Sequence, residues 1–133
     1  MHYHQGRLID HIHLRVRDLE RSRMFYKAVL SALGRRFTHE GETFFSADEL
    51  YVDAADTYVS RLHLAFQASD RDAVRRFHAA GLAHGGRDYG PPNERDYHDG
   101  YYACFLLDPD GNNIEAVHHG PVTRSADEIV IDR

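Results

Sequence analysis

Apolar and polar residues alternate along residues 8–16, where every second residue from Ile12 to Val16 is apolar. This period of two predicts a β-strand with one apolar face. Directly afterwards, apolar residues recur at helical spacing over 19–33, behind Asp18 as a candidate N-cap. The chain is therefore expected to begin with a strand followed by a helix.

The same order restarts after residue 60. A second strand pattern covers 61–68, and a second helical pattern covers 71–80, behind Asp70. Three intervals measured from a histidine recur 52 residues later: His11 to Asp18, Phe25 and Gly34, then His63 to Asp70, Phe77 and Gly86. A repeat of this length indicates a duplicated supersecondary unit. The alternative is that two unrelated strand–helix segments share a capping Asp and an inward Phe.

Short strand patterns complete each half. In the first half they cover 36–38, 43–46 and 50–52, and in the second half 101–107 and 113–118, the last two joined by a turn at 108–112. A polar segment, 87–100, is interpreted as a cavity wall or lid, with an exposed loop as the alternative. The prediction is an α+β fold in one domain, 1–133. It consists of two βαβββ modules, about 7–59 and 60–119, that form a curved mixed sheet around a metal-binding cavity, followed by a tail, 120–133.

Composition narrows the function classes. With 16 basic and 21 acidic residues the formal net charge is −5, which argues against a nucleic-acid binder. Apolar runs are too short to span a membrane, and the N-terminus lacks the apolar segment of a secretion signal. The single cysteine, Cys104, cannot form an internal disulfide and is predicted to pack against the helices, so a cytoplasmic location is expected. The 11 histidines are many for this length, and histidine is the commonest metal ligand.

Strand parity selects a candidate metal site. His11 and His63 begin equivalent strands and lie on the face opposite the apolar residues. Glu115 lies in the middle of an apolar-rich strand, where a lone carboxylate is costly unless it is paired or bound to a cation. Two histidines and one carboxylate suit one Fe, Mn, Co, Ni or Zn ion, with coordination positions left open. The competing interpretation is an ion pair between Glu115 and Arg15 without metal.

Three motifs resemble those of the vicinal oxygen chelate superfamily, which includes glyoxalase I, extradiol dioxygenases and bleomycin resistance proteins. They are the segments 10–22 with Phe25-Tyr26, 62–66, and 107–115. The resemblance covers about residues 8–119 and implies the same ligands, His11, His63 and Glu115. Alignment of the strand ends places Tyr51 where some relatives have a fourth, carboxylate ligand. Phe105 stands where extradiol dioxygenases have an acid-catalytic Tyr.

Other residues have candidate roles around this site. Glu115, His13 and Tyr51 are the possible catalytic bases, and His13 could instead orient a ligand or contact substrate. The candidate substrate-binding residues are Arg15, His98, Tyr101, Tyr102 and Phe105.

The leading hypothesis is a metal-dependent enzyme of the glyoxalase I type, a lyase or isomerase that moves a proton on a small oxygen-bearing substrate. The alternatives are an Fe(II) or Mn(II) dioxygenase and a non-catalytic binder of small molecules. A homodimer with twofold symmetry is expected, because related folds pair as dimers.

Overall fold

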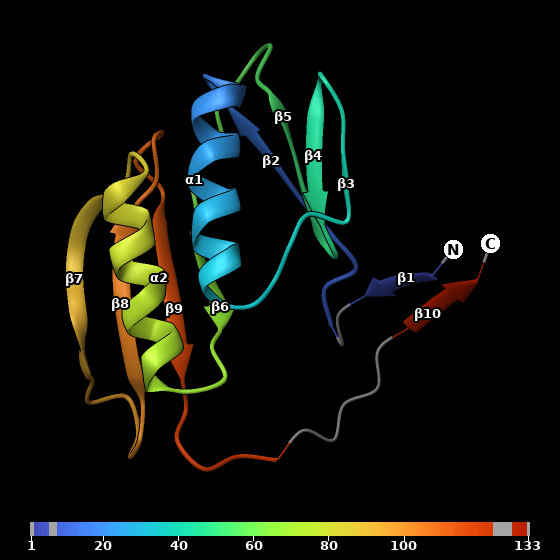
Figure 1. Cartoon of the computed structure of the whole chain (residues 1–133). Coiled ribbons are helices and arrows are strands. Elements are labelled where there is room, and N and C mark those ends of the chain that lie inside the picture. The colour runs from blue at the N-terminus through green and yellow to red at the C-terminus, as the bar shows by residue number, and fades with distance from the viewer. Residues whose placement is uncertain (1, 6–7, 124–128, 133) are drawn as a thin grey trace.

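The computed structural model describes residues 2–5, 8–123 and 129–132. Within these ranges there are two helices, and ten strands form three sheets, which have the orders β1-β10, β2-β5-β4-β3 and β6-β9-β8-β7. In chain order the elements are β1 (His2–Gln5), β2 (Ile12–Val16), α1 (Leu19–Ala32), β3 (His39–Glu40), β4 (Phe44–Ala47), β5 (Leu50–Ala54), β6 (His63–Gln67), α2 (Arg71–Ala83), β7 (Arg87–Glu94), β8 (Tyr102–Leu107), β9 (Asn113–His118) and β10 (Ile129–Asp132). Figure 1 shows α1 and α2 side by side, with β2 to β5 beside α1 and β7 to β9 beside α2.

The two four-stranded sheets have the same topology, as the repeat predicts. We call β2–β5 with α1 the first module, and β6–β9 with α2 the second. In each, the first strand pairs in parallel with the last, which pairs antiparallel with the strand before it. Asp18 and Asp70 cap the two helices through their side chains, which accept hydrogen bonds from the backbone N–H three residues later. The α+β fold of two βαβββ modules is confirmed, with one mixed sheet per module.

One hydrophobic core joins the modules. Leu14 and Val52 of the first sheet and Leu106 and Ile114 of the second belong to the same buried cluster, together with the inner sides of both helices. Gly81 lies inside α2, where an added Cβ would come within 2.3 Å of the Leu106 side chain. The helix therefore approaches its sheet more closely than a larger residue at position 81 would allow. Helix α2 ends at Ala83, three residues beyond the predicted end.

The largest difference from the sequence prediction is β7. The polar segment 87–100 was expected to be a wall, lid or loop, but its first eight residues form an edge strand on β8. Pro91 and Pro92 are compatible with an edge position, because an edge strand leaves one row of N–H groups unpaired. Two register shifts, on either side of Gly90, interrupt the pairing.

Smaller differences concern the ends of elements. β2 begins only at Ile12, and Leu8 and Ile9 before it are exposed. The apolar patch of the tail pairs with the beginning of the chain, since β10 lies antiparallel to β1. Among the described residues, neither helix combines the length and the apolar character needed to cross a membrane.

Candidate active site

Each four-stranded sheet has one face against the shared core and a second face on which histidine, carboxylate and aromatic side chains lie. In β2 the side chains of Leu14 and Val16 are buried in the core, so His13 and Arg15 lie on the opposite face. In β6 the same alternation places His63 opposite Leu64. We call the faces with these histidines the open faces. They carry most of the residues selected from the sequence.

Glu115 lies on the open face of the second module, and only 3% of its side chain is exposed. It belongs to β9, between β6 and β8, and pairs in register with Ala65 and Phe105. The Nε2 atom of His63 is 2.7 Å from Glu115 Oε1, and the Tyr101 hydroxyl donates a hydrogen bond to Oε2. Both oxygens of a buried carboxylate are therefore bound by polar groups from flanking segments.

The electrostatics of this cluster keep Tyr101 protonated. Burial, together with the hydrogen bond to Glu115, raises the pKa of the Tyr101 phenol well above its ordinary value. Tyr101 therefore acts as a hydrogen-bond donor to the carboxylate throughout the ordinary pH range. Arg15 instead forms an ion pair with Asp56, at 2.7 Å, so the predicted Arg15–Glu115 alternative is wrong.

The predicted metal triad is only partly assembled within one chain. His63 and Glu115 lie together, whereas the Nδ1 atom of His11 is 2.7 Å from Asp10, and its side chain is 66% exposed. Within the described parts of the chain, no group of three or more His, Cys, Asp or Glu residues is arranged to hold a metal ion.

A second histidine–carboxylate pair lies on the open face of the first module. His13 Nε2 is 2.7 Å from Asp53 Oδ1. The Tyr51 ring meets the His13 ring edge-on and stacks against Phe44. His13 and Tyr51, two of the proposed bases, are thus in contact, and Asp53 is a partner that the sequence analysis did not assign. The available signal was parity, since Asp53 shares a face with Tyr51 and β5 pairs with β2 in parallel.

The remaining predicted substrate-binding residues divide between the two faces. His98 packs edge-on against Tyr101, and its Nε2 is 2.8 Å from Nδ1 of His119, a neighbour that the sequence analysis left out. Phe105 lies beside His63, with ring centroids 6.0 Å apart. Tyr102 lies on the core side instead, under the guanidinium groups of Arg71 and Arg75.

Cys104 also lies on the core side. It is fully buried, and its thiol contacts the backbone oxygen of Val74 on α2, as the alternation predicted. Burial raises the pKa of the Cys104 thiol to about 12, so the residue is a buried small side chain rather than a nucleophile.

Comparisons with known proteins agree with this architecture. The family model described as the Glyoxalase/Bleomycin resistance protein/Dioxygenase superfamily matches residues 8–116. A glyoxalase/bleomycin resistance protein from Albidiferax ferrireducens T118 is 34% identical, with a TM-score of 0.69 over 81% of this chain and 96% of that chain. The comparison with curated proteins gives no match.

Two further solved structures share the fold at lower identity. A glyoxalase/bleomycin resistance protein/dioxygenase family enzyme from Burkholderia phytofirmans PsJN is 20% identical, with a TM-score of 0.64 over 84% of this chain and 98% of that chain. The V278E mutant of glyoxalase I from Zea mays is 22% identical, with a TM-score of 0.60 over 82% of this chain and 45% of that chain.

Proposed function

Because the chain belongs to the glyoxalase/bleomycin resistance protein/dioxygenase superfamily, we propose that it is a divalent-metal-dependent enzyme that moves a proton on a small oxygen-bearing substrate. The observation that carries the proposal is Glu115, a buried carboxylate on an open sheet face beside an imidazole. A carboxylate at this depth needs a cation or hydrogen-bond donors, and no Lys or Arg contact to it is found among the described residues. Its polar contacts are His63, whose imidazole is also a metal ligand, and Tyr101.

The donor set of this cluster fits a metal ion. His63 presents a ring nitrogen next to a Glu115 oxygen, and one imidazole with one carboxylate provides two of the three protein ligands of an open catalytic site. We assign the third ligand to His11 of a second copy of the chain. A divalent ion held there would act as a Lewis acid on a substrate oxygen.

The shared core supports a site formed between two copies. Both sheets turn one face to that core, so their open faces point away from it, and in one chain His11 lies against Asp10 rather than in the His63–Glu115 pair. In a homodimer with twofold symmetry, the open face of the first module in one copy would lie against the open face of the second module in the other copy. Symmetry would repeat this contact, so that it occurs two times in the dimer. Both copies would then contribute to each of two equivalent sites.

His13 is the preferred general base in this arrangement. Asp53 binds its Nε2, so the other ring nitrogen, Nδ1, is left to accept a proton from the substrate. Asp53 stabilises the protonated ring and fixes its orientation, while the Tyr51 ring packs against its edge. Tyr101 stays protonated and holds the Glu115 carboxylate in place.

The test is complementation by mixed dimers. The protein is stripped with EDTA, and Mn(II) or Zn(II) binding is measured by calorimetry. About one ion per chain is expected for the wild type, with loss of binding for His11→Ala and His63→Ala and at least about 10-fold weaker binding for Glu115→Gln. His84→Ala, which removes an exposed histidine from the end of α2, is the matched control.

Mixing His11→Ala with Glu115→Gln, followed by subunit exchange, is expected to restore one intact site per heterodimer. Full binding by the His11→Ala homodimer would overturn the shared site. Absence of saturable metal binding by the wild type would overturn the enzyme proposal and favour a non-catalytic binder. Turnover that requires O₂ would replace proton transfer by oxygenase chemistry.

A further inference from the structure

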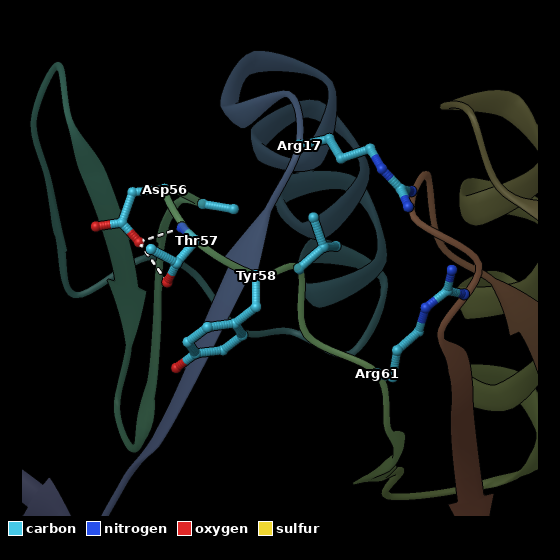
Figure 2. A pocket seen from close by; sticks show the side chains of 7 residues that line it. Arg17, Asp56, Thr57, Tyr58 and Arg61 are labelled. Atoms are coloured by element: carbon cyan, nitrogen blue, oxygen red, sulfur yellow. Dashed lines mark hydrogen bonds between the residues drawn. The ribbon is translucent and has the colours of Figure 1, made fainter.

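A pocket away from the open-face histidines lies where the two modules join. Its volume is about 520 Å³, and Arg17, Arg61 and the segment 55–59 line it. Figure 2 shows the two arginines reaching toward the same turn, while the Tyr58 side chain is directed away from them. None of these residues belongs to the His63–Glu115–Tyr101 cluster or to the His13–Asp53 pair.

Backbone contacts fix the pocket wall in the free protein. The segment 55–60 is held at both ends by the end of β2, where Ala55 N donates to Val16 O at 2.8 Å and Ser60 N donates to Arg15 O at 2.9 Å. The Ser60 hydroxyl in turn accepts a hydrogen bond from Arg15 N. The segment therefore forms a loop of defined shape, and a ligand would enter a preorganised site.

The charge in this pocket is not balanced. Both guanidinium groups contact Asp110, Arg17 through Nη1 to Oδ1 at 3.3 Å and Arg61 through Nη1 to the backbone oxygen at 3.4 Å. These hydrogen bonds are long, and of the two arginines only Arg17 contacts the Asp110 carboxylate, since Arg61 contacts the backbone. The other acid at the pocket, Asp56, is committed to Arg15 and to Thr57. Figure 2 shows its carboxylate directed away from the two arginines.

We propose that this pocket binds the oxyanion of a small organic acid, a phosphate ester or a carboxylate, between Arg17 and Arg61. Guanidinium groups match both oxyanions through paired N–H donors. The organic part would contact Ala55 and Val59, which also line the pocket. Because Arg17 belongs to the first module and Arg61 precedes the second, the ligand would also join the two modules.

The experiment uses phenyl phosphate and benzoate as probes of the two oxyanions, on metal-free protein at low salt. Calorimetry is expected to show saturable binding of at least one of them, and NMR is expected to show shifts of the Thr57, Arg61 and Gly111 amides. Arg17→Gln and Arg61→Gln should each weaken binding about 10-fold or more, since each removes a charge-assisted hydrogen bond. Arg36→Gln, an exposed arginine outside the pocket, is the charge-matched control and should have no effect.

A variant with the opposite effect completes the test. Asp110→Asn keeps an oxygen for the Arg17 backbone N–H but removes the negative charge between the arginines, so it should strengthen binding. Equal affinity in the wild type and in both arginine variants would overturn the proposal, as would weaker binding by Asp110→Asn or the absence of saturable binding by both probes. The metal experiment does not depend on this pocket, so either proposal can fail alone.

Discussion

Each module has a histidine on its first strand that contacts a carboxylate on the parallel last strand. The two pairs differ in their position along the strands and in how deeply the carboxylate is buried. In each, the acid lies two residues beyond the register partner of the histidine, and the N–O distance is 2.7 Å. By the 52-residue repeat His63 corresponds to His11, so the second module's pair lies two residues closer to the start of its strand than the pair of His13. Asp53 is 27% exposed at its side chain, whereas Glu115 is 3% exposed.

The difference in depth has a local cause. Glu115 is flanked by Phe105 on β8 and covered by the Tyr101 ring, both contributed by the longer second module. Asp53 is flanked by Phe44 on β4, whose ring lies against Tyr51. A buried acid is suited to binding a cation, and a more exposed one to orienting an imidazole. This difference in depth matches the roles proposed above, metal binding by Glu115 and orientation of His13 by Asp53.

The helices show a second divergence at equivalent positions. Tyr26 of α1 and His78 of α2 are 52 residues apart. Tyr26 is fully buried and donates a hydrogen bond of 2.6 Å to Asp108 in the second module. His78 lies 2.8 Å from Asp88 on β7 of its own module. One position therefore links the modules, while its counterpart supports an edge strand.

The largest expected effect separates the two carboxylates. Glu115→Gln should lower the affinity for Mn(II) about 10- to 100-fold, on the scale known for groups around a metal. Asp53→Asn should leave that affinity unchanged and should reduce turnover instead, because it acts through His13. Calorimetry with the two purified variants checks this, and an equal loss of metal affinity in both would show that the pairs are not specialised.

A gain-of-function change tests the equivalence of the sheets. Tyr51 stands at the position in β5 that corresponds to Glu115 in β9, so Tyr51→Glu gives the first module a matching carboxylate. In the proposed dimer it should tighten Mn(II) binding about 10-fold, since each anionic ligand adds attraction for the cation. Tyr51→Gln is the neutral control. Unchanged affinity in the Glu variant would argue against the facing arrangement of the two sheets.

Loss of the link between modules should cost less. Tyr26→Phe removes one donor to Asp108, which keeps the backbone N–H groups of Asp110 and Asn112 and the Asn112 amide. The expected loss in unfolding free energy is therefore about 1 kcal/mol, measured by urea denaturation. Tyr58→Phe, at an exposed tyrosine, should cost nothing. Two separate unfolding transitions in the variant would show that the modules can unfold independently.

The smallest effect concerns the edge strand. The hydrogen bond from His78 lowers the pKa of the Asp88 carboxyl. A lowered folded-state pKa contributes stability above the ordinary carboxyl pKa, and this contribution is lost as the pH falls through the folded-state value. Thermal melts should therefore show Asp88→Asn slightly less stable than the wild type near pH 6, with the difference vanishing in acid. A difference that persists in acid would assign the effect to something other than this charge.

Alternation and capping were enough to predict the strands and helices around the core. They failed at β7, because Gly90, Pro91 and Pro92 mark a loop unless a neighbouring strand is known to be there. The strand predicted at 36–38 is observed instead at 39–40, as β3. A strand of two residues has no alternation from which its position could be predicted.

Parity also predicted that His63 and Glu115 share a face, and the structure confirms their contact. It could not predict how the modules pack, so it gave no signal that His11 lies apart. Nor could it predict the contact of Tyr101 with Glu115, which depends on how the chain turns into β8 after His98. Local pattern determines faces, whereas the distances between faces depend on long-range packing.

The parallel pairing of first and last strands also constrains the order in which a growing chain can fold. β2 has no partner until β5 has been made, and Tyr26 has no acceptor until Asp108 follows more than eighty residues later. Contacts so distant in sequence slow folding, because loop entropy is lost before they form. During synthesis the first module would wait with its core side uncovered, so the interval before β8 and β9 leave the ribosome is when this chain is most exposed to misassembly.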